Sequence, residues 1–206
     1  WARYYVENVY EALTEPGEWY LDRPTGTPTY LPLPGETPER TEVFAPRIDQ
    51  LLLLAGRPAE NACVEFVRFV GLVFEHADWH QPTGGHDADT GSAPGIDYAA
   101  SPQAATGIGG AVSLEGARFC AIEDCAIRHV GLYAVDLRDG CRGNRIVGNE
   151  ITDCGGGGVK ATGADAHGAE GRRTGRNRIT DNHIHACGRV FHSAVGVILR
   201  HAFDNV

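Results

Sequence analysis

The sequence contains no methionine, no long apolar run and no excess of basic residues. Its 206 residues include 27 Asp and Glu against 18 Lys and Arg, a formal net charge of −9. No basic patch or RNA-type aromatic motif is present, so nucleic acid is not an expected partner. The most apolar run, Leu51–Ala55, is too short for a membrane span and is expected to be a buried strand.

The sequence also has no Cys-x-x-Cys pair, which removes a common zinc-binding pattern. Small buried thiols stacked in a repeating structure explain the cysteines better than a disulfide framework, which stays the alternative. Two of them occupy the same place in successive copies of a repeat. The six are Cys63, Cys120, Cys125, Cys141, Cys154 and Cys187.

The repeat has the pattern Ile-x-x-(Asn/Cys)-x-Ile-x-x-x-Gly and occurs at Ile122–Gly131, Ile146–Gly155 and Ile179–Gly188. Two isoleucines five residues apart do not make the apolar stripe of a helix. Short β-rich runs separated by Gly, Asn and Asp instead predict strands and tight turns. A unit this short cannot bury its own apolar face, so successive copies must stack on one another.

One more strand is expected after each repeat, at 133–137, 158–161 and 194–198. About three short strands per coil predict an all-β fold, a right-handed parallel β-helix or solenoid. Asn149 and Asn182 should lie in one row with Cys125. An Asn at such a corner tolerates left-handed backbone angles, and its amide can bond along the stack.

Residues 1–60 lack the repeat and are expected to form a separate segment leading into the solenoid. It should contain a short helix at 6–13 and a hairpin turning at 23–26. Residues 61–206 should form the coils, with insertions near 77–110 and 162–176. Because the chain lacks an initiator methionine and a new coil is expected to start at its last three residues, we expect a piece of a longer protein.

The N-terminal segment carries a specific signature in the runs Tyr4–Leu13, Glu15–Arg23 and Tyr30–Pro32. These runs resemble glycoside hydrolase family 141, whose members are bacterial parallel β-helix proteins. The resemblance implies α-L-fucosidase or xylanase activity on plant cell-wall polysaccharides, with a polysaccharide or oligosaccharide as substrate. It also implies an extracellular or periplasmic location and a catalytic pair of aspartates, which the resemblance does not assign to positions here.

Glycoside hydrolysis needs two carboxyl groups on either side of the scissile bond. Asp136 is the first candidate, because Val135 and Leu137 should point inward and Asp136 outward. Lys160 should stand beside it one coil on. The alternative for this pair is an exposed salt bridge of little consequence. Asp165 is the second candidate, since the insertion that carries it could lie over a cleft.

Three further residues are candidate substrate contacts. His129 and His192 could bind sugar hydroxyls or shuttle a proton, although a solvated surface histidine is the alternative for each. Tyr133 lies near Asp136 along one expected strand and could provide a platform for a sugar ring.

No metal site is expected from the sequence. His183 and His185 should face the same side of a strand, but two ligands without a nearby carboxylate do not predict zinc. Calcium through Asp87 and Asp89 is conceivable, yet their spacing matches no calcium-binding module. The expected cofactor is therefore none, with calcium as the open alternative.

The sequence thus favours a glycoside hydrolase on a parallel β-helix. A polysaccharide lyase or epimerase on the same fold is the first alternative, with Lys160 as its base. A non-catalytic glycan-binding or surface β-helix protein is the second.

Overall fold

The computed structural model describes residues 6–80, 104–164 and 167–206, and the chain divides into two units, Trp1–Phe44 and Ala45–Val206. In the first unit, strands β1 (Trp19–Asp22) and β2 (Thr27–Tyr30) form an antiparallel hairpin, which confirms that prediction. The expected short helix is a single 3-10 turn, η1 (Tyr10–Ala12).

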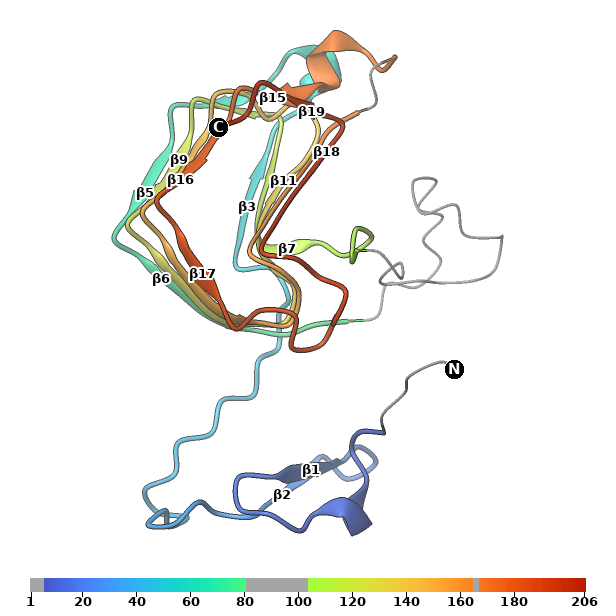
Figure 1. Ribbon diagram of the computed structural model, residues 1–206, viewed down its shortest axis with the longest axis vertical. Coiled ribbons are helices and arrows are strands. Elements are labelled where there is room, and N and C mark those ends of the chain that lie inside the picture. The colour runs from blue at the N-terminus through green and yellow to red at the C-terminus, as the bar shows by residue number, and fades with distance from the viewer. Residues whose placement is uncertain (1–5, 81–103, 165–166) are drawn as a thin grey trace. The chain divides into compact units, whose positions relative to one another are not determined.

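The second unit is a right-handed parallel β-helix, as the sequence predicted (Figure 1). Each full coil contributes one strand to each of three stacked parallel sheets. The β11 sheet contains β3 (Leu52–Ala55), β7 (Gly110–Glu115), β11 (Tyr133–Leu137), β14 (Val159–Thr162) and β18 (Val197–Arg200). The β12 sheet contains β5 (Arg68–Val70), β9 (Ala121–Glu123), β12 (Arg145–Val147) and β16 (Arg178–Thr180). The β13 sheet contains β6 (Val73–Ala77), β10 (Ala126–Val130), β13 (Glu150–Cys154) and β17 (His183–His185).

Shorter elements complete the corner between the β11 and β12 sheets. Two parallel strand pairs lie there, β4 (Val64–Glu65) with β8 (Ala117–Arg118) and β15 (Thr174–Gly175) with β19 (Ala202–Phe203). Two 3-10 turns, η2 (Pro58–Glu60) and η3 (Glu170–Arg172), contact one another. None of the helical turns in the described part of the chain is long and apolar enough to cross a membrane.

The core is built from the repeated isoleucines. In the β12 sheet Ile122, Ile146 and Ile179 are register partners on successive coils. In the β13 sheet Ile127 and Ile151 are register partners and both are fully buried. Each coil therefore closes the apolar face of the next, which is why a repeat with two isoleucines is stable only in a stack. Cys120, Cys125, Cys141 and Cys154 are buried free thiols within this core, as expected.

Two rows of asparagine side chains hold the corners of the coils together. Asn149 Oδ1 accepts a hydrogen bond from the Cys125 amide at 3.0 Å, and Asn182 Oδ1 accepts one from the Asn149 amide at 3.0 Å. A parallel row runs through Asn144, Asn177 and Asn205. The expected bonding along the stack is confirmed, because each buried amide satisfies backbone groups that no strand partner reaches.

The asparagines of this row do not themselves adopt the left-handed backbone angles that they could tolerate. The positive φ angles belong to the preceding residues, Asp124 at 51°, Gly148 at 71° and Asp181 at 60°. The preceding residue makes the bend, and the asparagine after it can then point inward along the stack. Glycine and aspartate are among the residues that adopt this conformation most readily.

Candidate functional site

A hollow of about 290 Å³ lies on the outer face of the β11 sheet. Strands β7, β11 and β14 provide its floor, and the segment before β7 provides a wall. Its lining is rich in charged groups, and the neutral Thr162 and Gly107–Gly109 complete it. The charged residues are Glu115, Asp136, Arg138, Asp139 and Lys160.

Asp136 faces away from the coil interior, because its neighbours Val135 and Leu137 occupy the core. Lys160 is its register partner on β14, as predicted. The Asp136 Oδ2 atom lies 3.4 Å from Lys160 Nζ and 3.0 Å from Arg138 Nε. Its Oδ1 atom is buried and has no hydrogen-bond partner among the described residues. The alternative of an exposed salt bridge was wrong, since the Asp136 side chain is only 1% exposed.

The cover over this pair is the backbone that precedes β7. Lys160 Nζ donates to the carbonyl oxygens of Ile108 at 2.5 Å and Thr106 at 3.3 Å. The lysine therefore joins the cover segment to the sheet as well as pairing with Asp136. An ammonium group with three acceptors around it fulfils its donor capacity within the protein.

Tyr133 does not provide an exposed sugar platform, so that prediction was wrong. Its side chain is fully buried in a small apolar cluster with Ile108, Leu132 and Phe191. Residues before β7 and between β17 and β18 fold over the start of β11, which a repeat-based reading does not anticipate. Burial raises the pKa of the Tyr133 phenol, as expected for a group whose charged form is desolvated.

Two carboxylates in the hollow were missed by sequence reasoning. Glu115 ends β7 and is half-buried, with the inward-facing Leu114 before it. Asp139 follows β11 and accepts a hydrogen bond from Arg172 Nε at 2.7 Å. The alternation that identified Asp136 also applies to Glu115, so a signal for it was present in Val112–Glu115.

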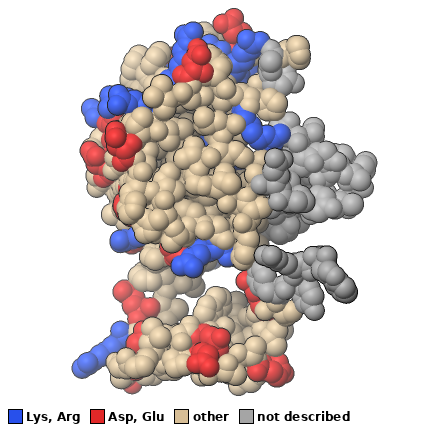
Figure 2. All heavy atoms as spheres, viewed as in Figure 1, with Lys and Arg blue, Asp and Glu red and all other residues tan. Residues whose placement is uncertain are grey.

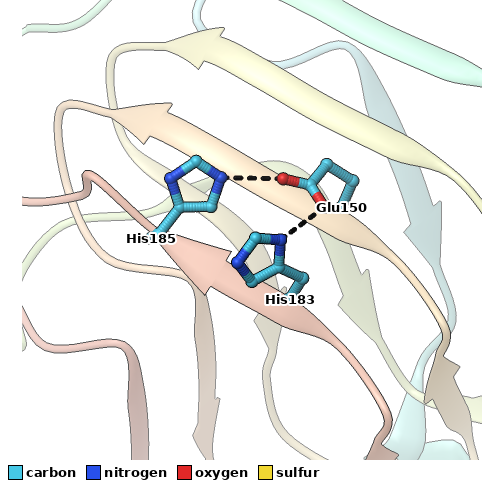
Figure 3. Close-up of side chains that lie close together, drawn as sticks. All are labelled: Glu150, His183 and His185. Atoms are coloured by element: carbon cyan, nitrogen blue, oxygen red, sulfur yellow. Dashed lines mark hydrogen bonds and ion pairs between the residues drawn. The ribbon is translucent and has the colours of Figure 1, made fainter.

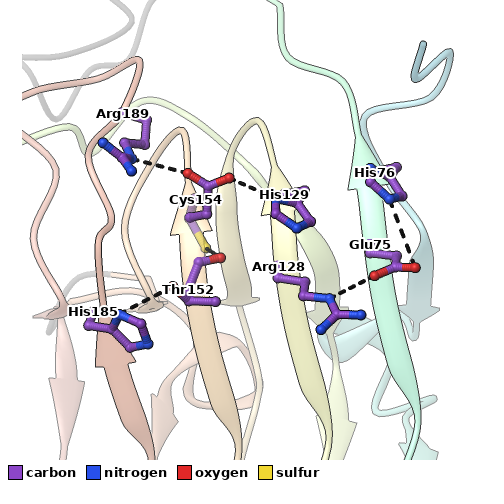
Figure 4. A network of polar contacts seen from close by, with 9 residues as sticks. Glu75, His76, Arg128, His129, Thr152, Cys154, His185 and Arg189 are labelled. Atoms are coloured by element: carbon purple, nitrogen blue, oxygen red, sulfur yellow. Dashed lines mark hydrogen bonds and ion pairs between the residues drawn. The ribbon is translucent and has the colours of Figure 1, made fainter. Parts of the chain in front are cut away.

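His129 belongs to a separate polar network at the corner that ends the β13 sheet strands (Figure 4). Its Nδ1 atom lies 2.7 Å from Asp153 Oδ2, and its ring stacks on that of His76 at 5.2 Å. Arg189 Nε donates to the other Asp153 oxygen at 3.1 Å. His129 and Asp153 both have positive φ.

The remaining predicted site residues do not join the hollow lining within the described part of the chain. His192 is exposed, and its Nδ1 atom lies 3.2 Å from the Val190 carbonyl oxygen. Asp165, and the calcium candidates Asp87 and Asp89, lie outside the described residues.

A third polar group occupies the outer face of the β13 sheet. His183 and His185 face the same side, as predicted, and Glu150 on the neighbouring strand contacts both. These two hydrogen bonds lower the pKa of the Glu150 carboxyl, and the one with His185 has the larger effect. Sequence reasoning missed Glu150, although aligning the repeats places it opposite His183.

In Figure 2 residues of both charges lie mainly towards the margins of the second unit, and the middle of the face in view is largely uncharged. Several ion pairs join successive coils, as the pair of Arg172 and Asp139 does.

A sequence profile described as "Right handed beta helix region" matches residues 110–206. Among solved structures, one protein named "Glycoside hydrolase" is similar over 93% of this chain, with a TM-score of 0.79 and 20% sequence identity. The chain spans 36% of the length of that protein. No curated protein matches the sequence. The structural similarity at this identity establishes the fold.

Proposed function

We propose that the protein is a carbohydrate-active β-helix protein, a glycoside hydrolase that acts on plant cell-wall glycan of fucosylated or xylan type. The observation that carries the proposal is the presence of three carboxylates, Glu115, Asp136 and Asp139, around one hollow on adjacent coils. Glycoside hydrolysis needs two such groups on one substrate-binding surface. The glycoside hydrolase with the same fold supports this choice of chemistry over others that a β-helix can host.

Glu115 and Asp136 are the proposed catalytic pair. Asp136 is held in place by Arg138 and Lys160, which suits a group whose position must be fixed. Glu115 is half-buried, and its side chain has no hydrogen-bond or ion-pair partner among the described residues. It is therefore the group better able to exchange a proton with a glycosidic oxygen. Asp165 remains the proposed alternative partner.

Substrate contacts follow from the same lining. Arg138 and Thr162 offer donors to sugar hydroxyls at the hollow. Lys160, whose ammonium already faces three acceptors, would position Asp136 for the substrate and would not itself bind a sugar. His129 and His192 would contact only a glycan that extends beyond it. We propose that the protein works outside the cytoplasm, where plant polysaccharides are found, and that it needs no cofactor for hydrolysis.

A polysaccharide lyase or epimerase is supported less well. Its base would be Lys160, but the Nζ atom already has two carbonyl oxygens and the Asp136 carboxylate around it. A base must be reachable by a proton on the sugar ring.

The test is a product assay of the complete natural chain on fucosylated and xylan-type glycans. Reducing-sugar release without ultraviolet absorbance is expected, and it should be lost in Glu115→Gln. Asp124→Asn is the matched control, because Asp124 is an exposed carboxylate at a corner of the coil. An unsaturated product that absorbs in the ultraviolet would show that the reaction is elimination and not hydrolysis. Glycan binding without turnover would support the non-catalytic alternative, and full activity in Glu115→Gln would remove Glu115 from the pair.

A further inference from the structure

We infer that Glu150, His183 and His185 form a binding site for one divalent transition-metal ion, such as Zn²⁺, on the outer face of the β13 sheet. The three side chains converge from two adjacent strands (Figure 3). One ligand atom from each lies within 4.8 Å of the other two. Nothing in the proposed glycan chemistry requires these residues.

The parallel register of β13 and β17 brings the three residues together. Glu150 is the register partner of His183, and Thr152 is the partner of His185. The side chains of Ile151 and Ile184 between them pack on the core. The ligands therefore project from the same face of a rigid sheet. No loop has to become ordered before an ion binds.

The three side chains are already in contact before an ion enters. The Nδ1 atom of His183 lies 2.8 Å from one Glu150 oxygen, and the Nε2 atom of His185 lies 2.7 Å from the other. A cation bound at about 2.0–2.2 Å from each ligand would replace the bridging protons with only small side-chain movements. Three protein ligands would leave the remaining coordination positions to water or another molecule.

The surroundings of His185 support the same assignment. The Nδ1 atom of His185, the ring nitrogen that faces away from Glu150, lies 3.3 Å from Thr152 Oγ1. A metal-ligating histidine characteristically donates its second ring N–H to a neighbouring oxygen, which fixes the tautomer and the ring orientation. The Thr152 hydroxyl is placed to accept that hydrogen bond when Nε2 binds the ion.

The ligand types select the class of ion. Two imidazole nitrogens and one carboxylate suit Zn²⁺, Co²⁺, Ni²⁺ or Cu²⁺, whereas Ca²⁺ and Mg²⁺ prefer sites made of oxygen alone. The exposed fractions are 71% for the His183 side chain and 46% for Glu150 and His185, so the site is open to solvent. Selectivity for transition metals over Ca²⁺ is therefore the feature to measure.

The experiment is titration calorimetry of the purified chain with Zn²⁺, and separately with Ca²⁺. We expect one Zn²⁺ per chain and at least a tenfold weaker affinity in each of Glu150→Gln, His183→Gln and His185→Gln. Ca²⁺ should not bind at this site. His80→Gln is the matched control, because His80 pairs with Asp49 at 2.7 Å on an exposed surface and its loss should leave Zn²⁺ binding unchanged.

Co²⁺ provides a second readout that excludes the cysteines. A visible d–d spectrum without a thiolate charge-transfer band, lost in His185→Gln, would support the site. A thiolate band that disappears in Cys187→Ser would overturn it, as would unchanged Zn²⁺ affinity in the three ligand variants. All three ligand positions are exposed, so circular dichroism should show these variants folded, and neither result depends on glycan turnover.

Discussion

The Asp136 carboxylate and the Lys160 ammonium lie on adjacent coils, 3.4 Å apart, with side chains only 1% and 8% exposed. They follow one another along the outer face of the β11 sheet, and the segment before β7 covers most of both side chains, although both still line the hollow. Their contribution to folding therefore differs from that of a surface pair, because removing one partner leaves the other charged and buried.

We expect Asp136→Ala and Lys160→Met each to lower the free energy of unfolding by about 3–5 kcal/mol. The double variant should cost less than the sum, with a coupling of about 1 kcal/mol or more. Urea unfolding followed by circular dichroism measures all three. Glu60→Ala is the control, since its pair with Arg57 is exposed and should contribute about 1 kcal/mol at most. Strict additivity would show that the two side chains act independently.

The asparagine row gives a second prediction. Asn149 is 1% exposed, accepts from the Cys125 amide and donates to the Ile122 carbonyl oxygen. Asn149→Ala leaves both backbone groups buried without a partner, so unfolding should become easier by at least about 2 kcal/mol. Asn182→Ala, nearer the end of the same row and partly exposed, should cost less. Equal losses in chemical denaturation would contradict the role of burial.

The bend after β13 gives a third prediction, which concerns the stability of a glycine variant. A Cβ atom on Gly155 would lie 2.2 Å from the Gly131 carbonyl oxygen on the preceding coil. Because the obstacle is backbone, Gly155→Ala should destabilise the protein by about 3 kcal/mol or more.

Gly196→Ala is the matched control, since the nearest atom to its added Cβ would be 3.8 Å away. Its melting temperature should stay close to that of the unmodified protein. If Gly155→Ala had the same melting temperature as Gly196→Ala, the coils would have to separate at this bend without loss of stability.

Period-two alternation and the repeat made much of this structure predictable. They identified the parallel β-helix, the pairing of Asp136 with Lys160 and the asparagine row. They could not reveal that Asp136 and Tyr133 are buried, because the covering residues Ala105 and Ile108 lie in a segment without repeats. The position of β18 also differed, at Val197–Arg200 instead of 194–198, since irregular residues precede it.

The candidate site was less predictable than the fold for the same reason. Glu115 and Glu150 were accessible to register arguments, because alternation applies to β7 and repeat alignment applies to β13. The closure of a hollow around Glu115 depends on how residues 107–109 pass over the sheet, and short-range patterns carry no information on that path.

Glu123 provides a prediction for the acid limb of the stability curve. Its side chain is 7% exposed and lies between Arg68, 2.5 Å away, and Arg145, 2.6 Å away. The hydrogen bond from Arg68 is the main cause that lowers the pKa of Glu123 in the folded protein. The unfolded chain, with a pKa of about 4.3, therefore binds this proton more readily than the folded chain does.

The sign follows from that difference. The contribution of Glu123 is fully present above pH of about 4.3 and is lost as pH falls through the lower folded pKa. Melting temperatures between pH 3 and 7 should show Glu123→Gln below the unmodified protein at pH 7, with a gap that narrows in acid. Glu65→Gln, at an exposed position on β4, should show no such convergence. A gap that stays constant down to pH 3 would mean that Glu123 contributes through packing, because only an ionised carboxylate attracts Arg68 and Arg145.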